Sequence, residues 1–329
     1  MIKASLKFLI FFFFLPFSIL YSQNGEIFEV DEVEFVYKGT TNFDDGVLGD
    51  VVGINKADVF TQSVLAEDIF KLQKFYFDNG FFDTKVDTLV KYNLEDKEVI
   101  VQFTIDENKQ YRIDSLIYYG LENISNDARS AMDSIKSIRE KIHYNKVLII
   151  QQTNRIVDML QNTGYMNATI RLKNGTVITK YQDGCTVNIY FENADTVFYF
   201  GKTKVKINDN IYDVDEDLLY ERIEYKEGDR YSKEVRLMTE RNMSRLAIIQ
   251  SARAEVESTD GNKADFLINV NLAKKTEITP FITGTNVDNR FFFGGGVQYI
   301  NKYFWSGGKV LNLTGTALIN SFDINRFEF

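Results

Sequence analysis

The sequence contains few of the residues that build stapled domains or reactive sites. Its 329 residues include 1 Cys, 1 His and 2 Pro. A single cysteine cannot form a disulfide within the chain, and one Cys with one His cannot complete a typical zinc site. The same scarcity excludes most nucleophile–base pairs of enzymes. So few prolines also exclude collagen-like and proline-rich architectures.

The lone cysteine and histidine have structural interpretations. Cys185 lies in the alternating run YQDGCTVNIYF, where it suits a small apolar position in a strand. His143, in EKIHYNK, suits a loop or the start of a helix. The sequence shows no Ser-centred elbow, metal cluster or cofactor fingerprint. We therefore expect no enzyme, with no catalytic residue, no metal and no cofactor.

The charge balance is acidic, with 38 Lys+Arg against 47 Asp+Glu and a net charge of -9. An acidic chain has no overall attraction to nucleic acid or to anionic lipid, so we expect no nucleic-acid partner. Hydrophobic residues make up 44% and aromatic residues 14% of the chain, which is enough for a sizeable core and excludes global disorder.

Residues 1–22 have the pattern of a secretory signal peptide. Lys3 and Lys7 precede an apolar run from Phe8 to Leu20, and Ser22 offers a small residue for cleavage. The apolar run is short for a membrane span of about 20 residues. A permanent N-terminal anchor is the alternative. Export without paired cysteines favours a protein of the bacterial envelope.

Three segments repeat one order of elements: strand, helix, helix, strand, strand. Alternating runs open them at residues 27–39, from Tyr111 and from Val197, and other alternating runs close them at 97–107, 185–193 and 264–274. The predicted repeats are residues 27–110, 111–196 and 197–275. Because each repeat mixes two helices with a small sheet, the predicted fold class is α+β.

The longer helix of each repeat is predicted from apolar residues at helical spacing. These are Val64, Leu65, Ile69, Leu72 and Phe75; then Val147, Ile150, Ile156, Val157 and Leu160; then Val235, Leu237, Met238, Met243 and Leu246. Gly80 and Gly164 end the first two helices, since glycine just past a helix accepts a positive φ. The third repeat lacks this glycine, and its short helix has Asp213 or Asp215 as the expected N-cap.

These repeats resemble POTRA domains. In that family, a helix is followed by Gly-aromatic and two strands, and the chain then runs through an aromatic residue and Ile into the next opening strand and its Gly. Here those positions are Tyr111, Ile113, Ile117 and Gly120. The resemblance covers about residues 27–275 and implies three tandem POTRA (β-α-α-β-β) repeats.

Residues 276–329 lack helical signals and show alternating strands at Ile278–Thr285, Phe291–Asn301 and Lys309–Ser321. In the last strand, Leu311, Leu313 and Ile319 fall on one face, opposite Asn and Thr. Such alternation over about 10 residues suits a transmembrane β-strand with these three residues facing the membrane. An ordinary sheet with one wet face fits the periodicity equally well.

The position of this segment after the repeats resembles the start of the barrel in BamA/TamA-type outer-membrane assembly proteins, the bacterial surface antigen superfamily. The residues that carry this resemblance are Asn301, Phe304, Gly307 and Gly308, in a turn followed by a new strand. It implies that residues 276–329 are the first strands of an incomplete antiparallel β-barrel. Tyr303, Phe304 and Trp305 would then be interfacial aromatic residues. Three strands cannot close, so a longer protein is expected.

The resemblance implies an outer-membrane protein assembly, insertion or translocation factor in the cell outer membrane, with a periplasmic POTRA arm. Its partners would be unfolded outer-membrane protein clients, periplasmic or lipoprotein assembly partners, and outer-membrane lipid. A soluble or peripheral periplasmic scaffold is one alternative. A two-partner secretion pore is another, although that type usually carries fewer repeats.

POTRA modules bind by presenting sheet edges to extended segments. The expected client-binding edges are the middle strands in sequence order, at Phe82–Val90, Tyr165–Lys173 and Ala252–Glu257. The candidate residues on them are Phe82, Val86, Tyr165, Ile170, Ala252 and Val256. Neighbouring repeats or partners could instead cover these edges.

Ile278, Pro280 and Ile282 are the candidates for the barrel seam. Pro280 removes one backbone donor and would weaken pairing there. Alternatively, it marks the junction between the third repeat and the strands that follow.

Overall fold

A computed structural model describes residues 27–320 except 137, 139–140, 183, 288–289 and 306–307. The predicted signal peptide, Gly307 and residues 321–329 of the predicted barrel segment lie outside the described residues. The chain divides into two compact units, Met1–Gln110 and Tyr111–Phe329. Among the described helices, none is long and apolar enough to cross a membrane.

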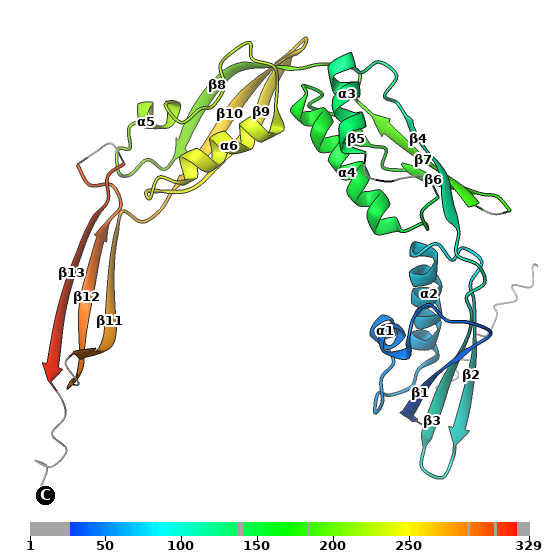
Figure 1. Ribbon diagram of the computed structural model, residues 1–329. Helices are drawn as coiled ribbons and strands as arrows, with labels where there is room; N and C mark the ends of the chain where they lie inside the picture. Colours follow the sequence, from blue (N-terminus) through cyan, green and yellow to red (C-terminus); the bar gives the residue numbers. More distant parts are fainter. Residues whose placement is uncertain are drawn as a thin grey trace, which may run out of the picture. The chain divides into compact units, whose positions relative to one another are not determined.

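The first unit contains β1 (Glu29–Tyr37), α1 (Asp45–Val51), α2 (Gln62–Asp78), β2 (Lys85–Asn93) and β3 (Glu98–Asp106). Its sheet has the order β1-β3-β2, with β1 parallel and β2 antiparallel to β3. A parallel pair needs a long crossover, which the two helices supply. They cover one face of the sheet (Figure 1).

Local chemistry sets the ends of these helices. The Asp44 side chain accepts the N–H of Val47 at the start of α1, and the Thr61 hydroxyl accepts that of Val64 at the start of α2. Gly80 follows α2 with φ 90°, as predicted for a glycine that ends a helix. Buried Leu72 and Tyr76 of α2 then pack on the sheet residues Val101 and Phe103.

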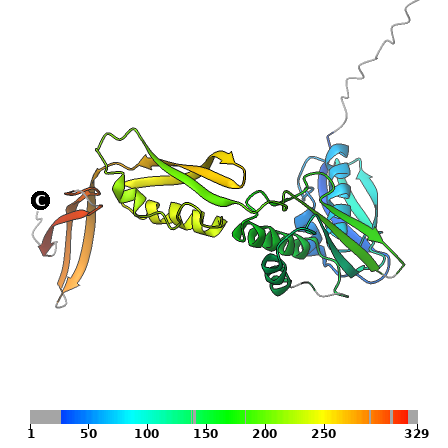
Figure 2. The same cartoon turned by 90° about the horizontal axis from the view of Figure 1, so that it is seen from above.

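The second repeat contains β4 (Arg112–Tyr119), α3 (Asn126–Ile135), α4 (Lys146–Asn162), β5 (Thr169–Ile170), β6 (Thr176–Lys180) and β7 (Gly184–Glu192). The sheet has the order β4-β7-β5, and β6 also pairs with β7. The third repeat contains β8 (Tyr199–Asn208), α5 (Asp217–Tyr220), α6 (Lys233–Ser244), β9 (Ile249–Asp260) and β10 (Lys263–Leu272), in the order β8-β10-β9. In the third repeat, α6 lies on one face of the sheet (Figure 2). The predicted α+β class and the repeated β-α-α-β-β order are confirmed.

The last sheet is antiparallel and consists of β11 (Thr276–Val287), β12 (Arg290–Asn301) and β13 (Leu311–Asn320), in that order. Its strands agree with the three alternating runs of the sequence, although β11 begins earlier and ends later than expected. Within the described residues the sheet is open, with β11 and β13 as its edges.

Two local predictions in the second and third repeats were wrong. Val147 and Ile150 are 59% and 47% exposed, because the buried stripe of α4 runs through Ile149, Thr153, Ile156 and Leu160 instead. In the third repeat, α5 has only 4 residues and its N-cap position is Glu216. The expected caps lie before it: the carboxylate of Asp215 accepts the N–H of Asp217, and Asp213 has a positive φ.

Candidate functional site: open sheet edges and an exposed apolar face

Each repeat sheet ends in the strand that comes second in the chain. These edges are β2, the pair β5 and β6, and β9, whose single partners in the described chain are β3, β7 and β10. An edge strand carries backbone N–H and C=O groups that can pair with another chain. The sheet order therefore puts the second strand region of each repeat at an edge, although its bounds differ from those predicted.

The opposite edge of each sheet is covered at its start by the segment before the longer helix. In the first repeat, Val30 N–H donates to Asp58 (2.8 Å), Ala57 N–H donates to Val30 (2.7 Å), and Phe60 N–H donates to Phe28 (2.9 Å). Residues 141–144 pair with the start of β4 in the same way, and residues 228–231 with the start of β8. These bonds are repeated features of the fold, and they occupy the first-strand edge at that end.

In the first repeat, the edge strand has the predicted length but lies three residues later in the chain. It begins at Lys85, and Phe82 lies in the preceding turn, where its ring is 4.8 Å from that of Phe77. The Thr84 hydroxyl fixes this turn by donating to the carbonyl oxygens of Phe81 (3.0 Å) and Glu107 (3.2 Å). Val86 is 8% exposed and points into the core.

In the second repeat, the predicted edge Tyr165–Lys173 is not one strand. Tyr165 is buried, and its hydroxyl accepts the N–H of Ser125 at 2.7 Å, so it belongs to the core. Ile170 lies half-buried in the two-residue β5, and a turn over residues 171–175 separates β5 from β6. A Cβ at Gly175 would overlap the carbonyl oxygen of Arg171, which explains the glycine in this tight turn.

The third repeat has the longest edge strand of the three, with 12 residues in β9. Val256 is 45% exposed and pairs with Phe266, whereas Ala252 is half-buried and pairs with Val270. Register shifts lie at both ends of the β9–β10 pairing. Such bulges bend the strand and increase its local twist.

One face of the last sheet is apolar and exposed. Directly paired residues of an antiparallel sheet share a face, and the register aligns Ile278 with Tyr299 and Leu313. The large apolar residues of this face that are 44% to 78% exposed are Ile278, Ile282, Phe291, Phe293, Val297, Leu313 and Ile319. Such a concentration of exposed apolar side chains marks an interaction surface.

The opposite face of the sheet is mainly polar. It carries Thr279, Thr283, Gln298, Asn312, Thr314 and Thr316, with Phe281, Phe292, Ile300 and Leu318 as apolar residues among them. The ring of Phe281 covers Gly296 on the neighbouring strand, and a Cβ at Gly294 would overlap the Ala317 carbonyl oxygen. The glycine triplet of β12 thus permits close approach of backbone and ring.

The three predicted interfacial aromatic residues have different environments. Tyr303 is 5% exposed in the core of the third repeat, and its hydroxyl accepts the N–H of Asp215 at 3.2 Å. An interfacial residue is exposed, so the structure places Tyr303 elsewhere than expected. Trp305 is 83% exposed, and Phe304 is half-buried with its ring 5.9 Å from that of Trp305.

The residues that suggested reactive chemistry have structural surroundings. Cys185 is buried, and burial followed by the charge of Asp114 raises the pKa of its thiol to about 11. A thiol with a raised pKa is a poor nucleophile. The Nε of Arg112 lies 3.3 Å from His143 Nε2. No three His, Cys, Asp or Glu side chains of the described residues gather as a metal site would require.

Two buried carboxylates in the first repeat were missed in the sequence. Asp68 has no exposed surface and accepts the N–H groups of Gly53 and Ile54 at 2.8 and 2.9 Å. Glu107 accepts from Tyr76 Oη at 3.0 Å and from the amide groups of Asn42. Both hold loops against α2. Their only signal in the sequence was position: Asp68 lies within an apolar helical stripe, and Glu107 lies at the end of a predicted strand.

Comparison with known proteins finds a family similarity over the first of these repeats. The model of the POTRA family, described as "Surface antigen variable number repeat", matches residues 28–108. No curated protein matches the sequence.

Solved structures with a similar arrangement include POTRA3-5 of BamA from Haemophilus influenzae, at 16% identity and a TM-score of 0.45, covering 77% of this chain and 99% of that one. POTRA1-3 of Omp85 from Anabaena aligns at 15% identity and a TM-score of 0.35, covering 75% and 96%. CdiB from Acinetobacter baumannii aligns at 10% identity and a TM-score of 0.35, covering 65% of this chain and 39% of that one.

Proposed function

We propose, from the premise that residues 28–108 form a POTRA domain, that this chain belongs to an outer-membrane protein assembly or translocation factor. Its three repeats form a periplasmic arm that binds extended client segments. The repeats are residues 27–110, 111–196 and 197–275. The segment that follows them, residues 276–329, contains the last three strands and is the part that inserts into the membrane. The partners are unfolded outer-membrane proteins, accessory assembly proteins and outer-membrane lipid.

The observation that carries this proposal is the two-faced last sheet. Ile278, Ile282 and Ile319 are 69%, 78% and 70% exposed on one face, while threonine and asparagine residues line much of the other. In water, three aligned strands of exposed Ile, Phe, Val and Leu would promote aggregation. Against lipid they bury apolar surface, and the period of two matches an apolar-out strand.

The repeats contribute backbone pairing rather than chemistry. An extended segment that adds to β2, to the pair β5 and β6, or to β9 satisfies unpaired N–H and C=O groups whatever its side chains are. Such pairing accepts many sequences, which suits a factor that handles many clients. Side chains on the edge then adjust affinity: Leu89 of β2 is 51% exposed and Val256 of β9 is 45% exposed.

The edge strand of the first repeat should contact a client directly. We expect a photoreactive benzoylphenylalanine in place of Leu89 to cross-link to an unfolded outer-membrane polypeptide. The matched control carries the same group in place of Phe70, which is 64% exposed on α2, away from the sheet edge. The measurement is the yield of cross-linked product on a gel. Equal yields from the two positions would show that binding does not use the edge.

Pro280 lies inside β11 rather than at its first residue, Thr276, and it pairs with Val297. Proline is tolerated in an edge strand where its missing donor faces the open side. We propose that it limits pairing along the outer edge of β11, the seam of the barrel. Pro280→Val restores the donor and should slow client insertion by strengthening the seam. Insertion into proteoliposomes at an unchanged rate would count against this role.

A further inference from the structure

The outer edge of β1 carries a groove that is separate from the β2 edge. The backbone hydrogen bonds between residues 57–60 and β1 extend only as far as Val30. At Asp31, a bulge interrupts the pairing register of β1 with β3. From Asp31 to Tyr37, the backbone bonds given for the described residues run to β3 alone. The outward N–H and C=O groups of this half of β1 can therefore accept another strand.

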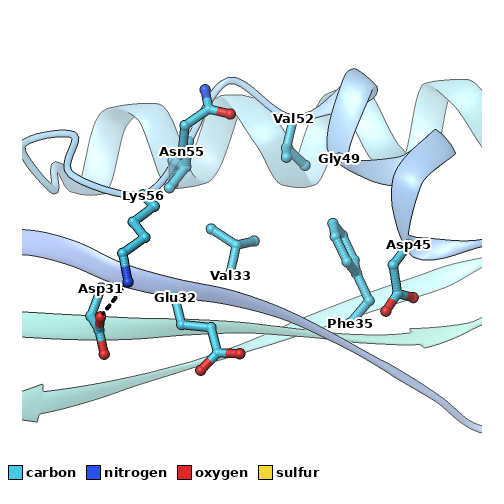
Figure 3. A pocket seen from close by; sticks show the side chains of 10 residues that line it. Asp31, Glu32, Val33, Phe35, Asp45, Gly49, Val52, Asn55 and Lys56 are labelled. Atoms are coloured by element: carbon cyan, nitrogen blue, oxygen red, sulfur yellow. Dashed lines mark hydrogen bonds and ion pairs between the residues drawn. The ribbon is translucent and has the colours of Figure 1, made fainter.

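A groove of about 540 Å³ lies along this open half, between β1 and the segment of α1 and its following loop (Figure 3). Val33, Phe35 and Val52 point into it, and Ile54 completes the apolar lining. Its volume falls within the roughly 300–1,000 Å³ of ligand-binding clefts. Because the floor of the groove is apolar, it suits the apolar side chains of a bound segment.

The rim of the groove is acidic. Asp31, Glu32 and Asp45 line it together with the single ammonium group of Lys56. Lys56 is already paired with Asp31 at 3.0 Å, and that hydrogen bond raises the pKa of its ammonium group. Asp45 accepts from the Tyr37 hydroxyl at 2.6 Å, which leaves its negative charge uncompensated. The rim thus favours a positively charged occupant.

We propose that this groove binds an extended polypeptide segment that alternates apolar residues with Lys or Arg. Successive side chains of a strand point to opposite sides. Alternate apolar side chains would enter the groove over Val33 and Phe35, while the cationic ones reach the carboxylates of the rim. Backbone pairing with β1 would fix the register. The site is selective by charge, unlike the proposed backbone pairing on β2.

Gly49 offers a direct test because it lines the groove from α1 and an added Cβ would meet no atom within 4 Å. Gly49→Trp should fill the groove without disturbing the core, whereas Gly49→Ala adds only a methyl group. The probe is a fluorescein-labelled eight-residue peptide alternating Val with Lys, titrated into the full chain in detergent by anisotropy. We expect Gly49→Trp to weaken binding about tenfold or more and Gly49→Ala to leave it unchanged.

Charge is tested separately. Glu32→Gln should weaken binding about threefold at low salt, while Glu255→Gln on the edge strand β9 should have no effect. A peptide with Glu in place of Lys should bind at least about tenfold more weakly than the Lys peptide. Equal binding by Gly49→Trp and Gly49→Ala, or equal binding of the two peptides, would overturn the proposal.

The inference rests on the proposed function in one respect only: that function supplies the bound segment, which comes from a client or an assembly partner. The titration needs neither a membrane nor client insertion. A chain that binds the Val/Lys peptide at the groove but fails to enter membranes would retain this site and refute the proposed function. A chain that inserts into membranes but binds both peptides equally would retain the proposed function and refute this site.

Discussion

Asp68→Ala should lower the free energy of unfolding of the first repeat by about 3–5 kcal/mol. The carboxylate has no exposed surface and accepts two backbone N–H groups, at Gly53 and Ile54. Removing it leaves both donors without their acceptor where the loop meets α2. It also leaves a cavity beneath the loop that precedes α2, so the loop and helix should loosen together.

Hydrogen exchange measures this loss locally, in the amides of β3, where Val99, Val101 and Phe103 are buried. Lys71→Ala is the matched control, because it removes the ion pair that Asp68 makes at 3.1 Å but leaves the two backbone bonds. The Lys71 side chain is 35% exposed, so its removal should cost less than about 1 kcal/mol. Equal effects of the two substitutions would mean that the ion pair, not the backbone bonds, carries the stability.

Leu313→Lys should reduce partitioning of the chain into lipid by about 2–4 kcal/mol. Leu313 is 55% exposed on the apolar face of the last sheet, beside Tyr299 in the register. A lysine there would place an ammonium group among Ile, Val and Phe side chains. The measurement is the fraction of chain that floats with liposomes and resists extraction by alkaline carbonate.

The neighbouring residue supplies the control. Thr314 lies on the opposite face of β13 and pairs with Gln298, so Thr314→Lys should leave flotation unchanged. If both lysine variants lose membrane association equally, charge alone explains the effect and the apolar face has no special role. If carbonate removes the unmodified chain from liposomes, the chain is a peripheral scaffold.

The sequence predicts the repeats well because their elements depend on local patterns. The alternation in residues 97–107 reflects burial of one face of a strand. The helical spacing of Leu65 and Leu72 likewise reflects burial of one face of a helix, and both leucines are buried. Gly80 and Gly164 mark helix ends because both have positive φ. These features need no knowledge of distant contacts.

The details of the candidate site depend on tertiary contacts that alternation does not encode. Tyr165 follows a helix-ending glycine and was expected on a strand, yet its hydroxyl accepts an N–H from Ser125, 40 residues away in sequence. The partial covering of β1 by residues 57–60 is made of backbone bonds, which leave no mark on residue type. The groove beside β1 also requires α1 in position. The choice of edge strands therefore came from the resemblance to POTRA domains, and neither it nor the residue pattern predicted where each edge is open.

Tyr303 gives the third repeat a core that is not continuous in sequence. Its ring lies 5.7 Å from the ammonium group of Lys275, and Gly308 approaches Leu246 and Leu218. The turn after β12 thus completes a hydrophobic cluster that begins more than a hundred residues earlier, at Phe198. The part of the chain that folds around this core therefore extends beyond the third repeat, which ends at residue 275, and includes the turn at Tyr303. Tension applied to the last sheet would reach the third repeat through a buried side chain as well as through the connecting backbone.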